Sequence, residues 1–424
     1  MITIPFIYFT LLSIWLIRKH HGIDLSAFLA IVYAFSGACT IIMDANDVYG
    51  FNGVCEKMAI SPWATFTYCA LLTLSIVPFS SLDSRTLKDI DIQKGWVVDG
   101  LSWVLIITFF VTLYSTFTNL DIVLHSDLKE VRDDVYDNMD KEQLTGIQYF
   151  LALPETFFSQ FSPVAILLYF LNVAKGRKST WFNWLLLLSS LTPVIKAVLI
   201  AGRTQPIYWF LSFTALYILF RPMYDKQQRR KALFPFLLFG ILVGGFIAAV
   251  TIARFKVADV LDDVGAYDSL LAYSGQSFVN FNDFYCNYIE SGIHWDRIFP
   301  LTNYFFINPG WDLEEYRDLI WSYSGMNIGV FFTFLGDLLI DLGRMGMTVY
   351  VLIFSAISYL ICRSANREGT IDLSRLLVIL ILFLVPLQGI FYYSYYKTNV
   401  GYFVVITLIV CGLLKYNIKT KYES

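Results

Sequence analysis

Charged side chains are scarce in this sequence. Asp, Glu, Lys and Arg make up 15% of the 424 residues, whereas a soluble globular protein carries about 25%. Hydrophobic residues make up 57% of the chain, and a soluble protein would need a polar surface to cover so large a core. Because the residues for that surface are missing, we expect much of the apolar excess to face lipid.

Several sequence signatures are also missing. The net charge is −3 and no basic block is present, which argues against a nucleic-acid partner. The cysteines are scattered, without a C-x-x-C pair or a Cys/His cluster spaced for zinc, and no P-loop, H-E-x-x-H, G-x-S-x-G or dinucleotide-binding motif occurs. We therefore expect neither a metal nor another cofactor. Cys55 and Cys286 fall in segments expected outside the membrane, where they could pair.

Continuous apolar runs of about 17–22 residues dominate the chain. They predict membrane-spanning helices, since a transmembrane barrel would show alternating segments of about 10 residues. We expect an all-α polytopic integral membrane protein with about 11 transmembrane helices, in a range of roughly 10–12. The first run lacks the basic start and cleavage site of a signal peptide, so we expect it to be retained. The predicted spans are residues 2–17, 24–43, 61–79, 97–117, 152–172, 181–201, 205–221, 232–252, 346–362, 376–392 and 400–415.

The placement of Lys and Arg orients these spans, because cytoplasmic connections carry an excess of both. Short basic connections alternate along the chain with acidic or aromatic ones. This alternation predicts an outer N-terminus and a cytoplasmic C-terminus. We expect one transmembrane domain over residues 1–424, with an acidic outer loop at 118–146 and a large aromatic-rich outer loop at 253–345. The basic connections are residues 18–19, 85–94, 175–178, 221–231, 363–375 and 415–421.

One apolar stretch, residues 328–343, carries two acids, Asp337 and Asp341. If it crossed the membrane fully, the basic 363–375 connection would be forced outside, so we expect a re-entrant or interfacial helix on the outer side. Residues four apart share one face of a helix. The two carboxylates could orient or deprotonate a sugar hydroxyl, or they could pair with Arg344 or another outer cation. The sequence leaves both readings open.

Three cations lie near the expected outer face. Lys196 lies inside the sixth predicted span, Arg203 follows that span directly, and Arg254 lies at the outer end of the eighth. The outer side is the disfavoured side for Lys and Arg, and guanidinium groups bind phosphate bidentately at any relevant pH. We expect these residues to bind a pyrophosphate. The alternative is that their long side chains only reach the membrane interface.

Other polar residues are weaker candidates. His294 and Arg297, in the large outer loop, could supply a base or a sugar contact. Asp89-Ile-Asp91 has the form of a metal–nucleotide motif, but it lies in a short cytoplasmic connection with no nucleotide-binding domain. The other acidic candidates are Asp44 and Asp47, in the first outer loop, and Asp99 and Glu155, at span edges where they could cap or pair.

Taken together, these motifs resemble the Wzy-type O-antigen and capsule polymerases, also called oligosaccharide repeat unit polymerases. The resemblance rests on Gly202-Arg203-Thr204 after a middle span, on Arg254 at the outer end of its span, and on the acidic apolar segment from Thr333 to Gly343. Arg254 and Gly265 also match the Arg-x10-Gly pattern of some members. The resemblance covers the architecture of the whole chain, although its motifs are short.

The resemblance implies a fold similar to GT-C glycosyltransferases in the bacterial inner membrane. Such enzymes transfer a glycan from undecaprenyl pyrophosphate to the terminal sugar of an undecaprenyl-pyrophosphate-linked repeat unit, without a nucleotide sugar or metal. Membrane lipid and a chain-length regulator are the other partners it allows. Arg203, Arg254 and Lys196 would then stabilise the leaving pyrophosphate, and Asp337, or else Asp341, would act on the acceptor hydroxyl.

Other functions stay open. A lipid-linked oligosaccharide flippase also carries charges within the membrane, but it would show two similar halves and no dominant outer loop. Asp44 and Asp47 resemble the catalytic acids of another group of polyprenyl-phosphosugar glycosyltransferases. An O-antigen ligase would carry a histidine in the large loop, but His294 lacks the surrounding pattern. A structural partner of a glycan-assembly complex would need no converging arginines.

Overall fold

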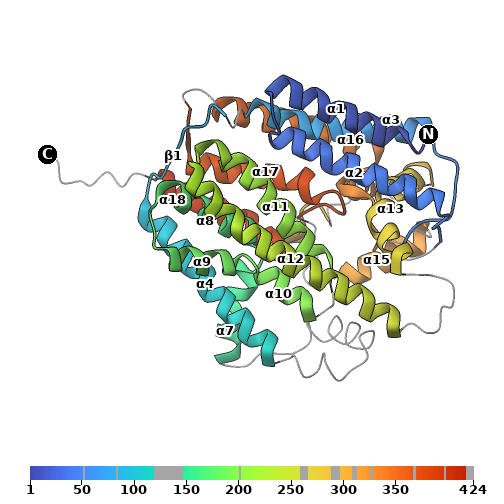
Figure 1. Cartoon of the computed structure of the whole chain (residues 1–424). Helices are drawn as coiled ribbons and strands as arrows, with labels where there is room; N and C mark the ends of the chain where they lie inside the picture. The colour runs from blue at the N-terminus through green and yellow to red at the C-terminus, as the bar shows by residue number, and fades with distance from the viewer. Residues whose placement is uncertain are drawn as a thin grey trace.

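A computed structural model gives the fold of this chain (Figure 1). It describes residues 1–50, 53–82, 85–118, 147–199, 202–257, 266–287, 297–307, 313–324, 328–365, 369–395 and 398–416. Helices dominate these residues, as predicted, and the two short strands β1 (Asp89–Asp91) and β2 (Thr370–Asp372) pair in parallel. Most of the predicted acidic loop 118–146 lies outside the described residues.

Among the described residues, four helical segments are long and apolar enough to cross a membrane. They are α2 (Leu25–Ala45), α3 with η1 (Pro62–Ser81), α4 (Gly95–Thr118) and α16 (Thr333–Ala365). Shorter apolar helices are α8 (Ser162–Lys175), α17 (Leu373–Gln388) and α18 (Thr398–Lys415). These helices indicate that the chain associates with a membrane. The other helices are α1 (Ile4–His20), α7 (Ile147–Phe158), α9 (Thr180–Ser189), α10 (Thr192–Leu199), α11 (Thr204–Phe220), η2 (Arg221–Met223), α12 (Lys226–Val257), α13 (Ala266–Asn287), α14 (Pro300–Thr302), η3 (Asn303–Ile307) and α15 (Leu313–Ser324).

Two of the predicted spans are interrupted. The 152–172 span consists of the end of α7 and most of α8, with a break at 159–161, and the 181–201 span consists of α9 and α10, with a break at 190–191. Each break is followed by a hydroxyl residue and a proline, Ser162-Pro163 and Thr192-Pro193. Proline donates no backbone hydrogen bond and disfavours helical geometry in the residue before it, so both pairs start new helices.

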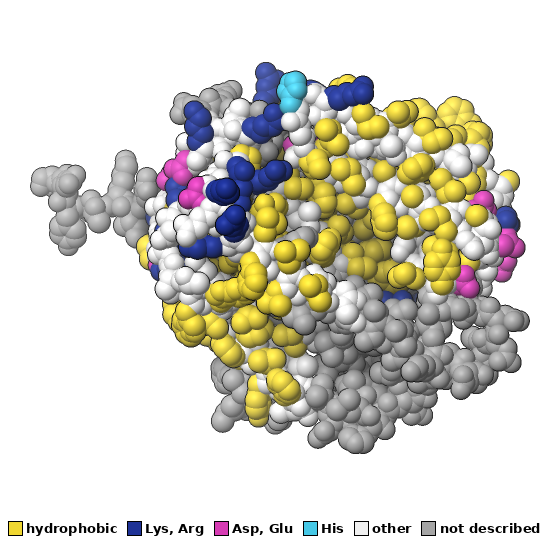
Figure 2. All heavy atoms as spheres, viewed as in Figure 1, with side chains coloured by type: hydrophobic (Ala, Val, Ile, Leu, Met, Phe, Trp, Pro, Cys, Tyr) yellow, Lys and Arg dark blue, Asp and Glu magenta, His cyan; other side chains and the backbone are white. Residues whose placement is uncertain are grey.

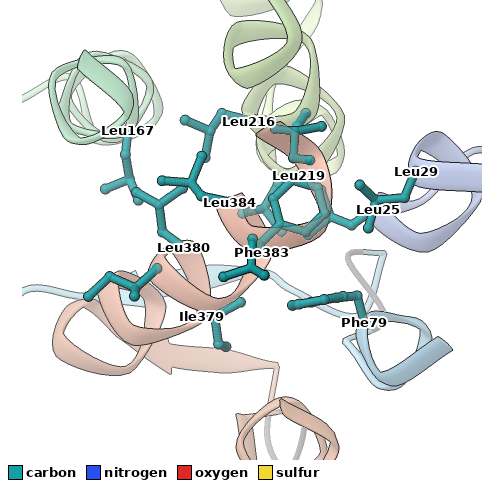
Figure 3. Packing of buried hydrophobic residues seen from close by; sticks show 14 of the residues in the cluster. Leu25, Leu29, Phe79, Leu167, Leu216, Leu219, Ile379, Leu380, Phe383 and Leu384 are labelled. Carbon is teal, nitrogen blue, oxygen red and sulfur yellow. The ribbon is translucent and has the colours of Figure 1, made fainter. Parts of the chain in front are cut away.

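The core forms around α17. Its Leu380, Phe383 and Leu384 point toward side chains of α8, α11, α2 and η1 (Figure 3). The ring of Phe383 packs edge-on against Phe79 of η1, with centroids 5.2 Å apart. Because α17 is apolar on every side that the bundle covers, its burial holds helices from both halves of the chain together.

Basic side chains gather at the end of the molecule where β1 lies, beside a broad surface of hydrophobic side chains (Figure 2). The β1–β2 pairing joins two connections that the charge pattern places in the cytoplasm. Lys175 pairs with Asp89, and Arg177 and Lys178 both pair with Asp99. Asp89 of the Asp89-x-Asp91 motif and Asp99 therefore both form ion pairs with basic residues 175–178.

Part of the predicted large outer loop is a helix packed into the bundle. Residues Ala266–Asn287 form α13, which packs against α2. Thr40 of α2 donates a hydrogen bond to the carbonyl of Gly275 at 2.7 Å. A Cβ atom at Gly275 would lie 2.8 Å from the Cys39 carbonyl oxygen, closer than such atoms can approach. The contact between the two backbones therefore requires glycine.

Gly275→Ala is expected to destabilise the fold by about 1–3 kcal/mol, because the added methyl group overpacks the α2–α13 contact. Gly100→Ala in α4 is the matched control, since nothing lies within 4 Å of the added atom. That control should be neutral or stabilising by up to about 1 kcal/mol, from helix propensity alone. Unfolding in detergent measures both, and equal effects would contradict the packing argument.

Candidate functional site

The helix breaks meet each other inside the bundle. The Ser162 hydroxyl, at the start of α8, donates to the Ser190 carbonyl at 2.6 Å, and the Trp209 indole donates to the Ser190 hydroxyl at 2.8 Å. Gln388, at the end of α17, lines a cavity of about 20 Å³ together with Gln160 and Gln205. This volume is room for about one water. The breaks before α8 and α10 and the end of α17 thus meet at one group of polar residues, which we call the polar layer. It consists of Gln160, Ser162, Ser190, Gln205 and Gln388.

This polar layer lies at membrane depth under the predicted orientation. At about 1.5 Å per residue, α8 is roughly 21 Å long, shorter than the ~30 Å hydrocarbon core. If Lys175 lies at the cytoplasmic face, as the charge pattern predicts, the break before Ser162 would fall within the membrane. Irregular backbone at that depth persists only where protein or a water-filled cavity surrounds it, and interrupted helices often mark substrate sites in membrane proteins.

Arg203 lies beside this layer, in the turn before α11. Its side chain is 6% exposed, and no acidic side chain of the described residues pairs with it. Its Nη1 has no hydrogen-bond partner within that part of the chain. The guanidinium lies 5.3 Å from the ring centroid of Tyr273 in α13, whose hydroxyl is 2.6 Å from Thr204 Oγ1. A buried guanidinium stays charged, so this position is suited to an anion.

The position of Arg203 follows from a local turn. The Gly202 N–H donates to the Ala197 carbonyl at 2.8 Å, which closes the chain back over the end of α10. Pro206 lies in the first turn of α11, where proline is well tolerated. The sequence Gly202-Arg203-Thr204 therefore fixes the arginine between two helices.

An aromatic wall adjoins Arg203. The wall consists of Tyr208, Tyr273, Phe331, Phe391 and Tyr392. Phe331 has ring centroids at 4.6 Å from Tyr273, 4.7 Å from Phe391 and 4.8 Å from Tyr392. Tyr208 lies 5.8 Å from Phe391. Tyr208, Tyr273 and Tyr392 are only partly buried, so their faces can contact a ligand. The sequence predicted an aromatic-rich outer loop at 253–345, which contains Tyr273 and Phe331, but Tyr208, Phe391 and Tyr392 lie outside that loop and were missed. The run Phe391-Tyr392-Tyr393 at a span end was the available signal.

The two predicted catalytic acids form a buried network with Arg297. Asp337 and Asp341 are both fully buried. Asp337 Oδ1 lies 2.5 Å from Arg297 Nη2, and its Oδ2 accepts from the Tyr393 N–H. Asp341 accepts from the Arg297 N–H at 2.8 Å and from the Tyr316 hydroxyl at 2.9 Å. The carboxylates therefore fasten Arg297 of the outer loop to α16.

The sequence left open whether Asp337 and Asp341 act on a sugar hydroxyl or pair with a cation of the outer side. This geometry favours the ion pair. The partner is Arg297, however, and not Arg344, which donates to the Tyr285 carbonyl at 2.7 Å. The backbone at Gly343 is non-helical (φ 69°, ψ 177°), so α16 consists of two helices that meet at a kink, and the acidic segment 328–343 ends at that kink. Glycine allows this positive φ without steric cost. A re-entrant or interfacial position of this segment stays a prediction. A catalytic role for Asp337 or Asp341 stays a prediction.

The other predicted site residues are dispersed. Lys196 pairs with Glu155 at 2.7 Å, so its charge is already balanced. Asp47 and Asp44 lie 2.6 and 3.6 Å from the Lys57 ammonium. Arg254 belongs to α12, but its side chain lies outside the described part of the structure, as does all of His294.

Cys55 and Cys286 are both unpaired. Burial, with a smaller contribution from Asp283, raises the pKa of the Cys55 thiol to about 12. A thiol with so high a pKa is a poor nucleophile at neutral pH.

Within the described residues, no three His, Cys, Asp or Glu side chains are grouped to hold a metal ion. Arg203, the polar layer and the aromatic wall are the features that the structure brings together. Comparisons with protein-family models, with curated proteins and with solved structures found no match to this chain.

Proposed function

We propose that this protein is a membrane glycosyltransferase that polymerises lipid-linked oligosaccharide repeat units. The observation that carries the proposal is Arg203, a buried guanidinium with no acidic partner among the described residues, between a polar layer and an aromatic wall. A pyrophosphate attached to a sugar presents an anion next to a ring. That chemistry matches a fixed cation next to aromatic faces.

The proposed reaction joins two glycans. The bond between the donor sugar C1 and the pyrophosphate oxygen breaks, and the acceptor hydroxyl oxygen forms the new bond to C1. The hydroxyl proton passes to a base, and the pyrophosphate leaves with an added negative charge. A preorganised cation at the leaving group stabilises that charge as it develops, which is the role proposed for Arg203, with Arg254 as its second cation.

Asp337 remains the first candidate for orienting the acceptor hydroxyl, and Asp341 the second. Asp337 accepts a hydrogen bond from Tyr393, the residue next to Tyr392 of the aromatic wall. A carboxylate at that position lies close to the backbone that would hold the acceptor sugar. Its ion pair with Arg297 would have to open for proton transfer, so a positioning role is the simpler assignment.

The proposal includes the finer architecture that the sequence predicts. It takes about 11 spans in a GT-C-like arrangement, with the N-terminus outside and the C-terminus in the cytoplasm. The site then faces the outer side of the bacterial inner membrane, where undecaprenyl-pyrophosphate-linked repeat units are joined for O-antigen or capsule. A chain-length regulator is a proposed partner.

A gel of surface polysaccharide from a deletion strain tests the proposed function. Loss of a polymerase should leave single capped repeat units, and the wild-type gene should restore long chains. Absence of all surface repeats would indicate a flippase, and long chains retained on the carrier lipid would indicate a ligase. Either result would refute polymerisation.

A flippase is the second candidate, because interrupted helices at membrane depth also occur in secondary transporters. The breaks at 159–161 and 190–191 are the features in favour of it. They lie in neighbouring helices of one part of the chain, whereas the repeats of a transporter place such breaks in corresponding positions of two halves.

A further inference from the structure

A groove lies on the outside of the bundle, and neither Arg203 nor any residue of the aromatic wall lines it. It runs between the end of α3, η1 and the second half of α16, and has a volume of about 360 Å³. Its walls include Leu74, Val77 and Pro78 on one side and Leu352, Ala356 and Tyr359 on the other. Nearly all of this lining is apolar. The groove therefore belongs to the part of the surface that faces hydrocarbon.

The sequence builds this groove with small residues and a change of helix type. Ser355 and Ala356 leave space on the face of α16. On the opposite side, α3 gives way to the 3₁₀ helix η1 at Val77, with Pro78 in its first turn. A 3₁₀ helix is narrower than an α-helix. The groove therefore results from the way α3, η1 and α16 pack against one another.

A cation marks one end of the groove. Arg363 follows Tyr359 by one turn of α16, and its Nη1 donates to the Tyr359 hydroxyl at 3.2 Å. The guanidinium lies 5.8 Å from the centroid of that ring, and the side chain is exposed. Within the described residues, neither Arg363 nor Arg375, which donates to the neighbouring Ser364 carbonyl, has an acidic partner. This end thus presents positive charge that is free to bind an anion.

The length of the groove matches one leaflet of a bilayer. At about 1.5 Å per residue, α16 runs roughly 16 Å from Leu352 to Arg363. Half of a ~30 Å hydrocarbon core is about 15 Å. Tyr359 lies where a tyrosine is expected at a membrane interface, with its ring in the apolar region and its hydroxyl toward the polar one. The charge pattern places this end of α16 at the cytoplasmic face.

We propose that this groove binds an acyl chain of an anionic phospholipid from the cytoplasmic leaflet, with the lipid phosphate at Arg363. The chain fills the space left by Ser355 and Ala356. The phosphate accepts hydrogen bonds from the guanidinium, which is the arrangement that gives arginine its preference for phosphate. The site is separate from the one proposed for Arg203 and does not depend on the proposed reaction.

Native mass spectrometry of the full chain tests this site. The protein is purified in detergent and titrated with phosphatidylglycerol or with phosphatidylcholine of the same acyl chains. The wild type should retain one phosphatidylglycerol more strongly than phosphatidylcholine. Ala356→Phe should lose the bound lipid, because the ring fills the groove. Arg363→Gln should bind phosphatidylglycerol about fivefold more weakly, as expected for one cation near an anionic lipid, and Arg363→Lys should keep part of the preference.

Arg221→Gln is the matched control, since this arginine lies at the same face but at the end of α11. Its lipid preference should equal that of the wild type. Equal binding of the two lipids by the wild type, or unchanged phosphatidylglycerol binding by both Ala356→Phe and Arg363→Gln, would overturn the proposal. A dimer that Ala356→Phe abolishes would also overturn it, because a second copy of the chain would then cover the groove. Arg363→Gln changes an exposed residue, so the test does not depend on the fold tolerating Ala356→Phe.

Discussion

Replacing Arg203 with alanine is expected to reduce the formation of long glycan chains by a factor of about 10²–10³, the usual cost of removing one fixed charge-stabilising donor. The buried guanidinium lacks an acidic partner among the described residues, so its removal should not leave an acid unpaired. The fold should therefore survive while the activity is lost. The measurement is the chain-length distribution of surface polysaccharide in a deletion strain, with the amount of inserted protein determined in parallel.

Two further variants make this result specific. Arg221→Ala removes the same side chain from the opposite end of α11, where it is exposed, and should leave polymerisation unchanged. Arg203→Lys keeps the positive charge but loses the planar guanidinium that can bind phosphate through two hydrogen bonds, so it should retain only part of the wild-type activity. Normal chain lengths in cells producing Arg203→Ala would contradict the assignment of Arg203 to the pyrophosphate.

Replacing Arg297 with alanine is expected to destabilise the protein by about 3–5 kcal/mol, because it leaves a buried carboxylate without its cation. Asp337 is fully buried and pairs with this arginine at 2.5 Å. The loss should appear as a lower unfolding midpoint in detergent. Arg344→Ala, which removes an exposed arginine bonded to the Tyr285 carbonyl, should cost only about 0.5–1.5 kcal/mol. Equal effects of the two variants would argue against the buried network.

A double variant separates the structural role of Asp337 from a catalytic one. Replacing both members of a buried pair with apolar residues is often neutral, so Arg297→Met with Asp337→Leu should recover most of the stability lost in Arg297→Ala. If Asp337 only fastens the outer loop to α16, this double variant should also polymerise repeat units. A stable but inactive double variant would show that the Asp337–Arg297 pair takes part in the reaction.

Some features of the fold could be predicted because they depend on neighbours in sequence. Apolar runs predict helices wherever they occur, and α1, α2, α4 and α11 lie close to their predicted spans. The breaks before Ser162 and Thr192 were missed, although both carry a local signal. Hydroxyl–proline pairs within an apolar run start a new helix, and reading them as parts of continuous spans ignored the missing N–H of proline.

Composition and charge pattern alone determined that the chain is helical and associates with a membrane, and they singled out Arg203. Only the tertiary structure decided which charged side chains have an oppositely charged partner. Arg297 reaches Asp337 across 40 positions of sequence, and Lys196 reaches Glu155 across 41. The aromatic wall likewise draws its rings from α11, α13 and the segments flanking α16 and α17. Such contacts depend on how whole helices pack, because a side chain finds its partner only when the backbones that carry both are in place.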